Sequence, residues 1–220
     1  MDIAFAANQC ARFSADPKIE HEKAVTWIGR YLAATKDKGT IYSPRDEGFQ
    51  VYVDSDFAGN WDKDDASWDR DTARSRAGYI ITYAGCPVYW QSKLITEIAL
   101  STTEAEYVAA SEAIRSVIPM VRLMDELRSR GFTVFSTTPQ LHCKLFEDNS
   151  GALEMLRTPR FRPRTKHMNI KYHFFRSWTD GPNARIQVQR ISSENNLSDG
   201  LTKPVPQPIL ERHRMSTMGW

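Results

Sequence analysis

The segment QVYVDSDFAG, residues 50–59, predicts a buried strand that carries an acid near its end. Val51, Tyr52 and Val53 have the β-branched and aromatic side chains that are typical of strand interiors. Asp54 follows them directly, and a carboxylate inside a strand costs free energy unless a partner compensates its charge. A metal ion would be such a partner. Asp56 lies two residues further on and shares the same face if the strand continues.

The residues that follow predict two more strands in sequence. Residues 77–83 and 87–91 are rich in β-branched and aromatic side chains, and Ala84-Gly85 between them predicts a tight turn. Together with residues 50–57, they predict a meander of three antiparallel strands.

The rest of the chain predicts helices that alternate with strands. One helix is expected from an N-cap at Thr102 or Thr103 to Arg130, with Pro119 kinking or interrupting it. Three antiparallel strands followed by helix-linked strands predict an α/β fold with a mixed five-stranded sheet and helices on its faces. The other expected elements are strands at 141–148 and 184–191 and helices at 17–36, 149–156, 166–178 and 197–202.

Length and composition indicate an ordinary folded domain with its own core, since 41% of the 220 residues are hydrophobic. No apolar run approaches the ~20 residues that span a bilayer, and the N-terminus lacks the basic start of a secretory signal. The three cysteines are scattered singly, which favours a reducing compartment over a disulfide framework or a zinc site. We therefore expect an intracellular protein that has no membrane segment.

The charge distribution is more informative than the net charge of +2. Residues 157–176 combine Arg and Lys with Phe and Tyr and contain no acid, a composition suited to tracking phosphates. Residues 62–71 are mostly acidic. For both runs, an ordinary solvated surface remains an open alternative.

Four acids stand at the ends of predicted elements: Asp54, Glu106, Asp148 and Asp199. Helical geometry puts Glu106 on the apolar stripe that should face the sheet, whereas Glu104 lies ~200° away on the solvent side. Taken singly, Asp148 could be a helix cap, Asp199 a partner of a helix dipole, and Glu106 half of a capping box. Taken together, converging carboxylates repel one another unless cations lie between them. Oxygen ligands without a His or Cys cluster favour two Mg²⁺ ions, or Mn²⁺, which could clamp a phosphodiester.

Six motifs in series resemble the RNase H domain of copia-type LTR retrotransposon Pol polyproteins. They are VDSDFAG, SRAGYIITYAGCPVYWQSK, ALSTTEAEYVAASEA, EDNSGAL, RTKHMNIKYHFFR and LSDGLTKP. The first 45 residues resemble the thumb and connection tail of the preceding reverse transcriptase, but the YxDD polymerase motif is absent. The resemblance implies a reverse transcriptase tail at 1–45, an RNase H-like domain at 46–205 and a polyprotein tail at 206–220.

The resemblance also implies a function and roles for individual residues. Asp54, Glu106, Asp148 and Asp199 would be the catalytic metal ligands, with Asp54 bridging two Mg²⁺ ions. The activity would be hydrolysis of the RNA strand of an RNA–DNA hybrid during reverse transcription, beside the reverse transcriptase domain of the same polyprotein. The location would be the cytoplasm, in virus-like particles, or the nucleus. The candidate substrate-binding residues are Ser92, Lys93, Asn149, Arg164, Lys166, His167 and Lys171.

Some features leave alternatives open. Cellular RNase H enzymes carry a His in the loop before the last Asp, whereas residues 190–199 hold none, and His167 and His173 are the candidate substitutes. An integrase or transposase is disfavoured because the Glu comes second in the order of acids. A decayed or domesticated module that binds nucleic acid or supports a polymerase remains possible. The sequence does not indicate an oligomeric state.

Overall fold

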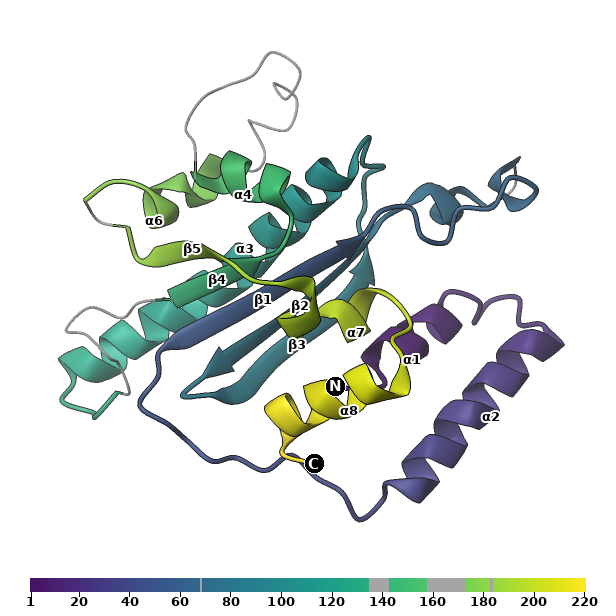
Figure 1. The fold of residues 1–220 in the computed structure, drawn as a ribbon, viewed down its shortest axis with the longest axis horizontal. Helices are drawn as coiled ribbons and strands as arrows, with labels where there is room; N and C mark the ends of the chain where they lie inside the picture. The colour runs from purple at the N-terminus through teal and green to yellow at the C-terminus, as the bar shows by residue number, and fades with distance from the viewer. Residues whose placement is uncertain (68, 135–142, 158–172, 183) are drawn as a thin grey trace.

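A computed structural model describes residues 1–67, 69–134, 143–157, 173–182 and 184–220. Its centre is a five-stranded sheet with the strand order β3-β2-β1-β4-β5 (Figure 1). β1 pairs antiparallel with β2, and β2 with β3, whereas β1, β4 and β5 run parallel. The predicted fold class, an α/β fold of the RNase H type with a mixed five-stranded sheet, is therefore confirmed. The strands are β1 (Phe49–Asp56), β2 (Arg76–Tyr83), β3 (Cys86–Leu94), β4 (Cys143–Glu147) and β5 (Ile186–Arg190).

The predicted meander of three strands forms as expected. In β1, side chains alternate between the faces of the sheet, and Phe49, Val51 and Val53 are buried in the core. The turn between β2 and β3 consists of Ala84 and Gly85, which both have positive φ angles, of 53° and 74°. Two successive residues with positive φ match the hairpin turn whose twist suits antiparallel strands.

Helix α3 (Thr102–Ser129) packs along one face of the sheet and supplies much of the core. The helix is continuous over 28 residues, so Pro119 does not interrupt it, and the alternative expectation of a kink stays a prediction. Pro119 and Arg115 are both exposed, so the Arg115 carbonyl that loses its helical partner can turn to water. The N-cap is Ser101 and not Thr102 or Thr103, because the Ser101 hydroxyl accepts the Glu104 N–H at 3.1 Å.

The predicted helices at 149–156 and 197–202 are present with shifted bounds. α4 (Ser150–Arg157) lies on the same side of the sheet as α3, and α7 (Asp199–Thr202) packs against β1 and β2 on the opposite side (Figure 1). Of the helix expected at 166–178, the described part is a 3-10 turn at His173–Phe175, followed by α6 (Arg176–Thr179).

Three helices flank the sheet near the two termini. The helix expected at 17–36 is α2 (Ile19–Ala34), whereas α1 (Ala4–Ala11) and α8 (Gln207–Met218) were not predicted. α1 contacts β3 and α7, α8 contacts β3, and α2 packs against α1. Much of the apolar stripe of α2 is uncovered, since Trp27 is 67% and Leu32 48% exposed.

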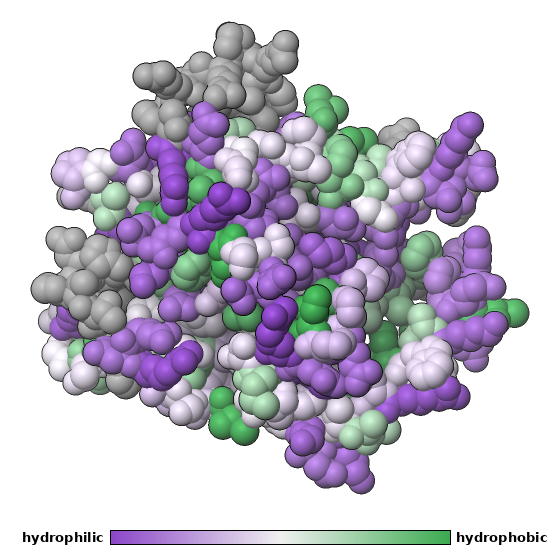
Figure 2. Space-filling model, viewed as in Figure 1, coloured by the Kyte–Doolittle hydropathy of each residue, from purple (hydrophilic) through white to green (hydrophobic). Residues whose placement is uncertain are grey.

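The surface seen in the view of Figure 1 is mostly hydrophilic. Apolar residues occur on it in separate groups and not as one continuous patch (Figure 2). Among the described residues, the helices are all too short or too polar to cross a membrane.

Candidate metal centre

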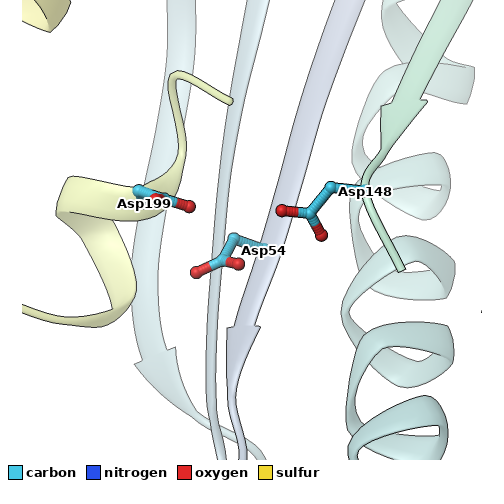
Figure 3. A group of neighbouring side chains, drawn as sticks. All are labelled: Asp54, Asp148 and Asp199. Carbon is cyan, nitrogen blue, oxygen red and sulfur yellow. The ribbon is translucent and has the colours of Figure 1, made fainter. Parts of the chain in front are cut away.

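Three aspartates meet at the edge of the sheet where the parallel strands β1 and β4 end. Asp54 lies on β1, Asp148 directly follows β4, and Asp199 is the first residue of α7. Their carboxylates face one another from these three elements (Figure 3), and one oxygen of each lies within 4.8 Å of the other two. Strand ends of parallel sheets are where ligands gather in α/β folds, because loops and helix starts converge there.

α7 reaches this position because the sheet has no side chain in its path. A Cβ atom on Gly78 of β2 would lie 2.6 Å from Thr202 Cγ2 and 2.8 Å from Leu201 Cβ. The segment before α7 is tied to β1, since the Asn196 side chain donates a hydrogen bond to the Val53 carbonyl at 2.8 Å. The Thr202 hydroxyl donates to the Asp54 carboxylate and thereby fixes its orientation.

Glu106 comes to the same region from the first turns of α3. The helix phase predicted from the sequence is correct, because Glu106 is only 6% exposed and the residues of its stripe, such as Ala110 and Val117, are buried. The capping role belongs to Glu104, whose carboxylate accepts the Leu100 N–H at 2.9 Å. The Glu106 carboxylate is therefore not used to cap the helix and is available to bind a cation.

A fifth acid, Glu147, was missed by the sequence analysis. It is the last residue of β4 and completely buried, and oxygens of Glu106, Glu147 and Asp148 lie within 4.8 Å of one another. The alternation of Cys143, Leu145 and Glu147 along β4 was the available signal, because every second residue of a strand faces the same side. The acids therefore form two groups of three, and Asp148 belongs to both.

Burial raises the pKa values of four acids of the centre: Asp54, Glu106, Glu147 and Asp199. The pKa of Asp54 rises to about 7, chiefly by burial, while the Lys203 ammonium lowers it and Asp199 raises it. Burial and the neighbouring Glu147 raise the pKa of Glu106 to about 10, and burial raises that of Glu147 to about 8. Without a cation, several of these acids therefore retain a proton near neutral pH.

Lys203 is the positively charged group that the chain itself places at the centre. Its Nζ lies 3.5 Å from an Asp54 oxygen and 3.4 Å from an Asp199 oxygen, and its side chain is 42% exposed. The sequence analysis quoted this lysine within LSDGLTKP but gave it no role. Its position partly compensates the charges of the group formed by Asp54, Asp148 and Asp199.

The donor set fits hard divalent cations. All the converging atoms are carboxylate oxygens, the ligands that Mg²⁺ and Mn²⁺ prefer. Buried oxygens of Glu106 and Glu147 have no hydrogen-bond partner among the described residues, and each would be satisfied by a cation. The four acids predicted from the sequence do converge, but their roles as metal ligands stay predictions, as does the bridging role of Asp54.

The other candidate residues lie in varied surroundings. Ser92 is 4% exposed and accepts a hydrogen bond from Arg76 at 3.2 Å, and Lys93 pairs with Glu112 at 2.6 Å. The Asn149 side chain accepts the Ala152 N–H at 3.0 Å and so caps α4. Substrate contacts by these residues stay predictions, and the remaining candidates lie outside the described residues: Arg164, Lys166, His167 and Lys171.

A cleft elsewhere on the molecule is lined by none of the five acids of the candidate metal centre. It is bordered by residues of β1, β2 and α8, among them Tyr52, Thr82 and His213. Its lining mixes basic, neutral and apolar side chains with a single acid, Glu194, so no group of carboxylates converges there. We therefore place the candidate chemistry at the carboxylates.

The sheet order and the acids at its edge define the chain as an RNase H-like α/β domain with a carboxylate centre. The chain is 35% identical over 213 residues to the retrovirus-related Pol polyprotein from transposon TNT 1-94 of Nicotiana tabacum, and 33% identical over 211 residues to that from transposon RE1 of Arabidopsis thaliana. Each match covers 96% of this chain. The chain is therefore similar, over almost its whole length, to one part of the retrovirus-related Pol polyproteins of copia-type transposons.

The polyproteins are much longer than this chain, so each match covers most of this chain but only a small part of the relative. The chain spans only 14% and 13% of the length of the two polyproteins. No family model matches the chain. Among solved structures, the N-terminal RNase H domain of a Mycobacterium tuberculosis protein is similar, with a TM-score of 0.46 and 12% identity, covering 79% of this chain and 99% of that one.

Proposed function

We propose that this chain is a ribonuclease H that uses two divalent cations, Mg²⁺ or Mn²⁺, to hydrolyse the RNA strand of RNA–DNA hybrids during retrotransposon reverse transcription. The observation that carries the proposal is the pair of acidic groups that share Asp148 at the carboxyl edge of the sheet. Similarity to the Pol polyproteins of copia-type transposons supports the biological setting.

Asp54, Asp148 and Asp199 would hold one cation, Glu106 with Asp148 would contribute to the other, and Asp54 would bridge the two. Bound cations would neutralise these acids and polarise both a water molecule and a phosphodiester for in-line displacement. The Thr202 hydroxyl holds the Asp54 carboxylate in one orientation, so that this ligand does not have to be ordered when a cation arrives. Lys203 holds a positive charge at the open side of the group, where a phosphate would approach.

Substrate recognition would rest on the shape of the duplex and on its phosphates. RNA-containing duplexes are read through a wide minor groove and the 2′-hydroxyls, while cationic side chains supply most of the affinity. The basic and aromatic run at 157–176 is the proposed phosphate-binding segment on sequence grounds. Arg164 and Lys166 are its first candidates for mutation.

The test is a cleavage assay with labelled duplexes at one ionic strength. The chain should cut the RNA strand of a hybrid in Mg²⁺, leaving 3′-hydroxyl and 5′-phosphate ends, and should lose this activity when EDTA removes the cation. Double-stranded DNA should remain intact. Equal cutting of hybrid, double-stranded RNA and double-stranded DNA would point to a general nuclease and overturn the proposal.

The same assay separates the proposal from its alternative, a decayed or domesticated module. Such a module would bind hybrid without cutting it at any concentration of Mg²⁺ or Mn²⁺. The full set of acids is the observation against decay, because a chain released from selection for cation binding has no reason to keep buried carboxylates together.

We also propose that residues 1–45 belong to the end of the reverse transcriptase, which would be a partner within the same polyprotein, and that residues 206–220 are its tail. The exposed apolar residues of α2, among them Ile19, Val25 and Trp27, support a contact with other parts of such a polyprotein. An intracellular location, in cytoplasmic virus-like particles or the nucleus, agrees with three free cysteines.

A further inference from the structure

Glu147 is a buried acid for which neither the fold nor the four predicted ligands provide a reason. It is completely buried at the end of β4, where one oxygen accepts the Asn149 N–H at 3.0 Å. Its other oxygen, Oε2, has no hydrogen-bond partner among the described residues. A carboxylate in this setting costs free energy both through desolvation and through the unsatisfied oxygen. An apolar residue at this position would carry neither cost.

Glu147 is not isolated, because a second unsatisfied carboxylate lies beside it. Glu106 is 94% buried, its Oε2 also has no partner, and oxygens of Glu106, Glu147 and Asp148 lie within 4.8 Å of one another. Two buried carboxylates, each with one oxygen that has no hydrogen-bond partner among the described residues, thus lie beside Asp148. Lys203 contacts Asp54 and Asp199, and within the described parts of the chain no ion pair involves Glu106, Glu147 or Asp148.

We propose that Glu147 is a ligand of the second divalent cation, which it would hold together with Glu106 and Asp148. Asp148 would then be shared with the first cation at Asp54 and Asp199. This inference rests on the proposed two-cation function and adds a ligand that none of the sequence motifs assigned.

The charge balance supports this arrangement. Five ionised carboxylates surround the two sites, and two divalent cations with the Lys203 ammonium carry five positive charges. With four carboxylates and the same cations, the centre would keep one uncompensated positive charge before any phosphate arrives. The fifth acid therefore gives the loaded centre a neutral sum, which lowers the cost of holding two cations in a partly buried site.

The test is Mn²⁺ binding to the full chain without nucleic acid, by isothermal titration and by electron paramagnetic resonance of free Mn²⁺. We expect two ions for the wild type and, for Glu147→Gln, loss or at least tenfold weakening of one ion with the other retained. Asp199→Asn should affect the other ion. Glu154→Gln, which removes an exposed acid on α4, is the control for loss of charge and should match the wild type.

Unchanged binding overturns the inference. If Glu147 is only a protonated core acid, glutamine is its neutral isostere, and Glu147→Gln will bind Mn²⁺ with the stoichiometry and affinities of the wild type. The inference is also overturned if the wild type binds only one Mn²⁺ ion and Glu147→Gln still binds that ion. If Glu147→Gln does not fold in EDTA, Glu147→Asp replaces it: a weakened ion supports the ligand role, and unaltered binding refutes it.

The result can be separated from the fate of the proposed function. A chain that cuts hybrid normally while Glu147→Gln binds two ions as tightly as the wild type would refute only the role of Glu147. A chain that cuts no duplex, but in which Glu147→Gln loses one Mn²⁺ ion, would refute the nuclease and keep the cation site.

Discussion

Replacing Asp54 with Asn should make the cation-free protein more stable at pH 8 and should abolish hybrid cleavage. Asp54 is 2% exposed and lies beside Asp148 and Asp199, so its ionised form is disfavoured in the folded state. The Asn side chain has the same shape and carries no charge, and its oxygen can still accept the Thr202 hydroxyl. The variant therefore removes the repulsion without removing the packing.

The size of the effect follows from the pKa of Asp54, which burial raises to about 7. Relative to an ordinary value of about 4, this corresponds to roughly 4 kcal/mol, at about 1.4 kcal/mol for each pKa unit. The repulsion is shared with the other acids, which relax when one is removed. We therefore expect Asp54→Asn to gain about half of this free energy of unfolding, roughly 2 kcal/mol. For a chain of this length, that raises the midpoint of thermal unfolding by about 4–8 °C.

The sign of the pH dependence follows from the same shift. The unfolded chain releases the Asp54 proton above pH ~4, whereas the folded chain keeps it up to pH about 7, so the wild type loses stability as pH rises through this window. The Asp54→Asn variant has no carboxyl group at this position, so it does not lose this stability as pH rises. The two proteins should therefore differ little near pH 4 and most at pH 8.

The assay is thermal unfolding in EDTA at pH 4.5, 6 and 8, followed by circular dichroism. Asp37→Asn, which removes an exposed acid, is the control and should unfold like the wild type at each pH. Addition of Mg²⁺ should stabilise the wild type more than Asp54→Asn. The reasoning would be refuted if Asp54→Asn unfolded at or below the wild-type temperature at pH 8, or if its gain were the same at pH 4.5.

Three further predictions concern the neighbouring residues. Glu106→Gln should lower hybrid cleavage by at least about 100-fold, because loss of a direct ligand should cost no less than the largest losses seen for outer-shell partners. Glu104→Gln should lower hybrid cleavage only slightly. Equal losses in the two variants would mean that the helix cap and the metal site are not separate. Ser92→Ala should lower the free energy of unfolding by about 1–3 kcal/mol, because the buried Arg76 loses an acceptor, and should weaken hybrid binding through the predicted substrate contact; an unchanged hybrid affinity would remove Ser92 from the substrate contacts. Reversing the charges of Arg164 and Lys166 should flatten the salt dependence of hybrid binding by roughly one to two units of slope, and an unchanged slope would remove both from the phosphate contacts.

The sequence was informative wherever periodicity decides the answer. Alternation located β1 and placed Asp54 in it, and the stripe of α3 separated Glu106 from Glu104. The positions of Asp148 and Asp199 at element ends followed from the order of strands and helices. These features depend on local geometry, and their convergence follows from the topology of a mixed sheet.

The remaining features depend on contacts that have no local signal. Glu147 stands next to Asp148, and its importance emerges only when α3 brings Glu106 across from a distant part of the chain. Lys203 reads as a surface lysine until α7 packs on Gly78 and turns it toward Asp54. α8 was not predicted, because its sequence has few apolar residues, and the helix buries only His213, Thr217 and Met218.

The close packing of α7 on Gly78 also has a consequence for the stage of synthesis at which the acidic centre can form. Thr202 lies 148 residues after Asp54, so the group that orients this carboxylate leaves the ribosome long after the carboxylate itself. A nascent chain that has exposed only its first three strands and α3 holds Asp54 and Glu106 but neither Asp199 nor Lys203. The acidic centre is therefore completed by the final segment of the domain, and a translation product truncated before α7 carries an unfinished site.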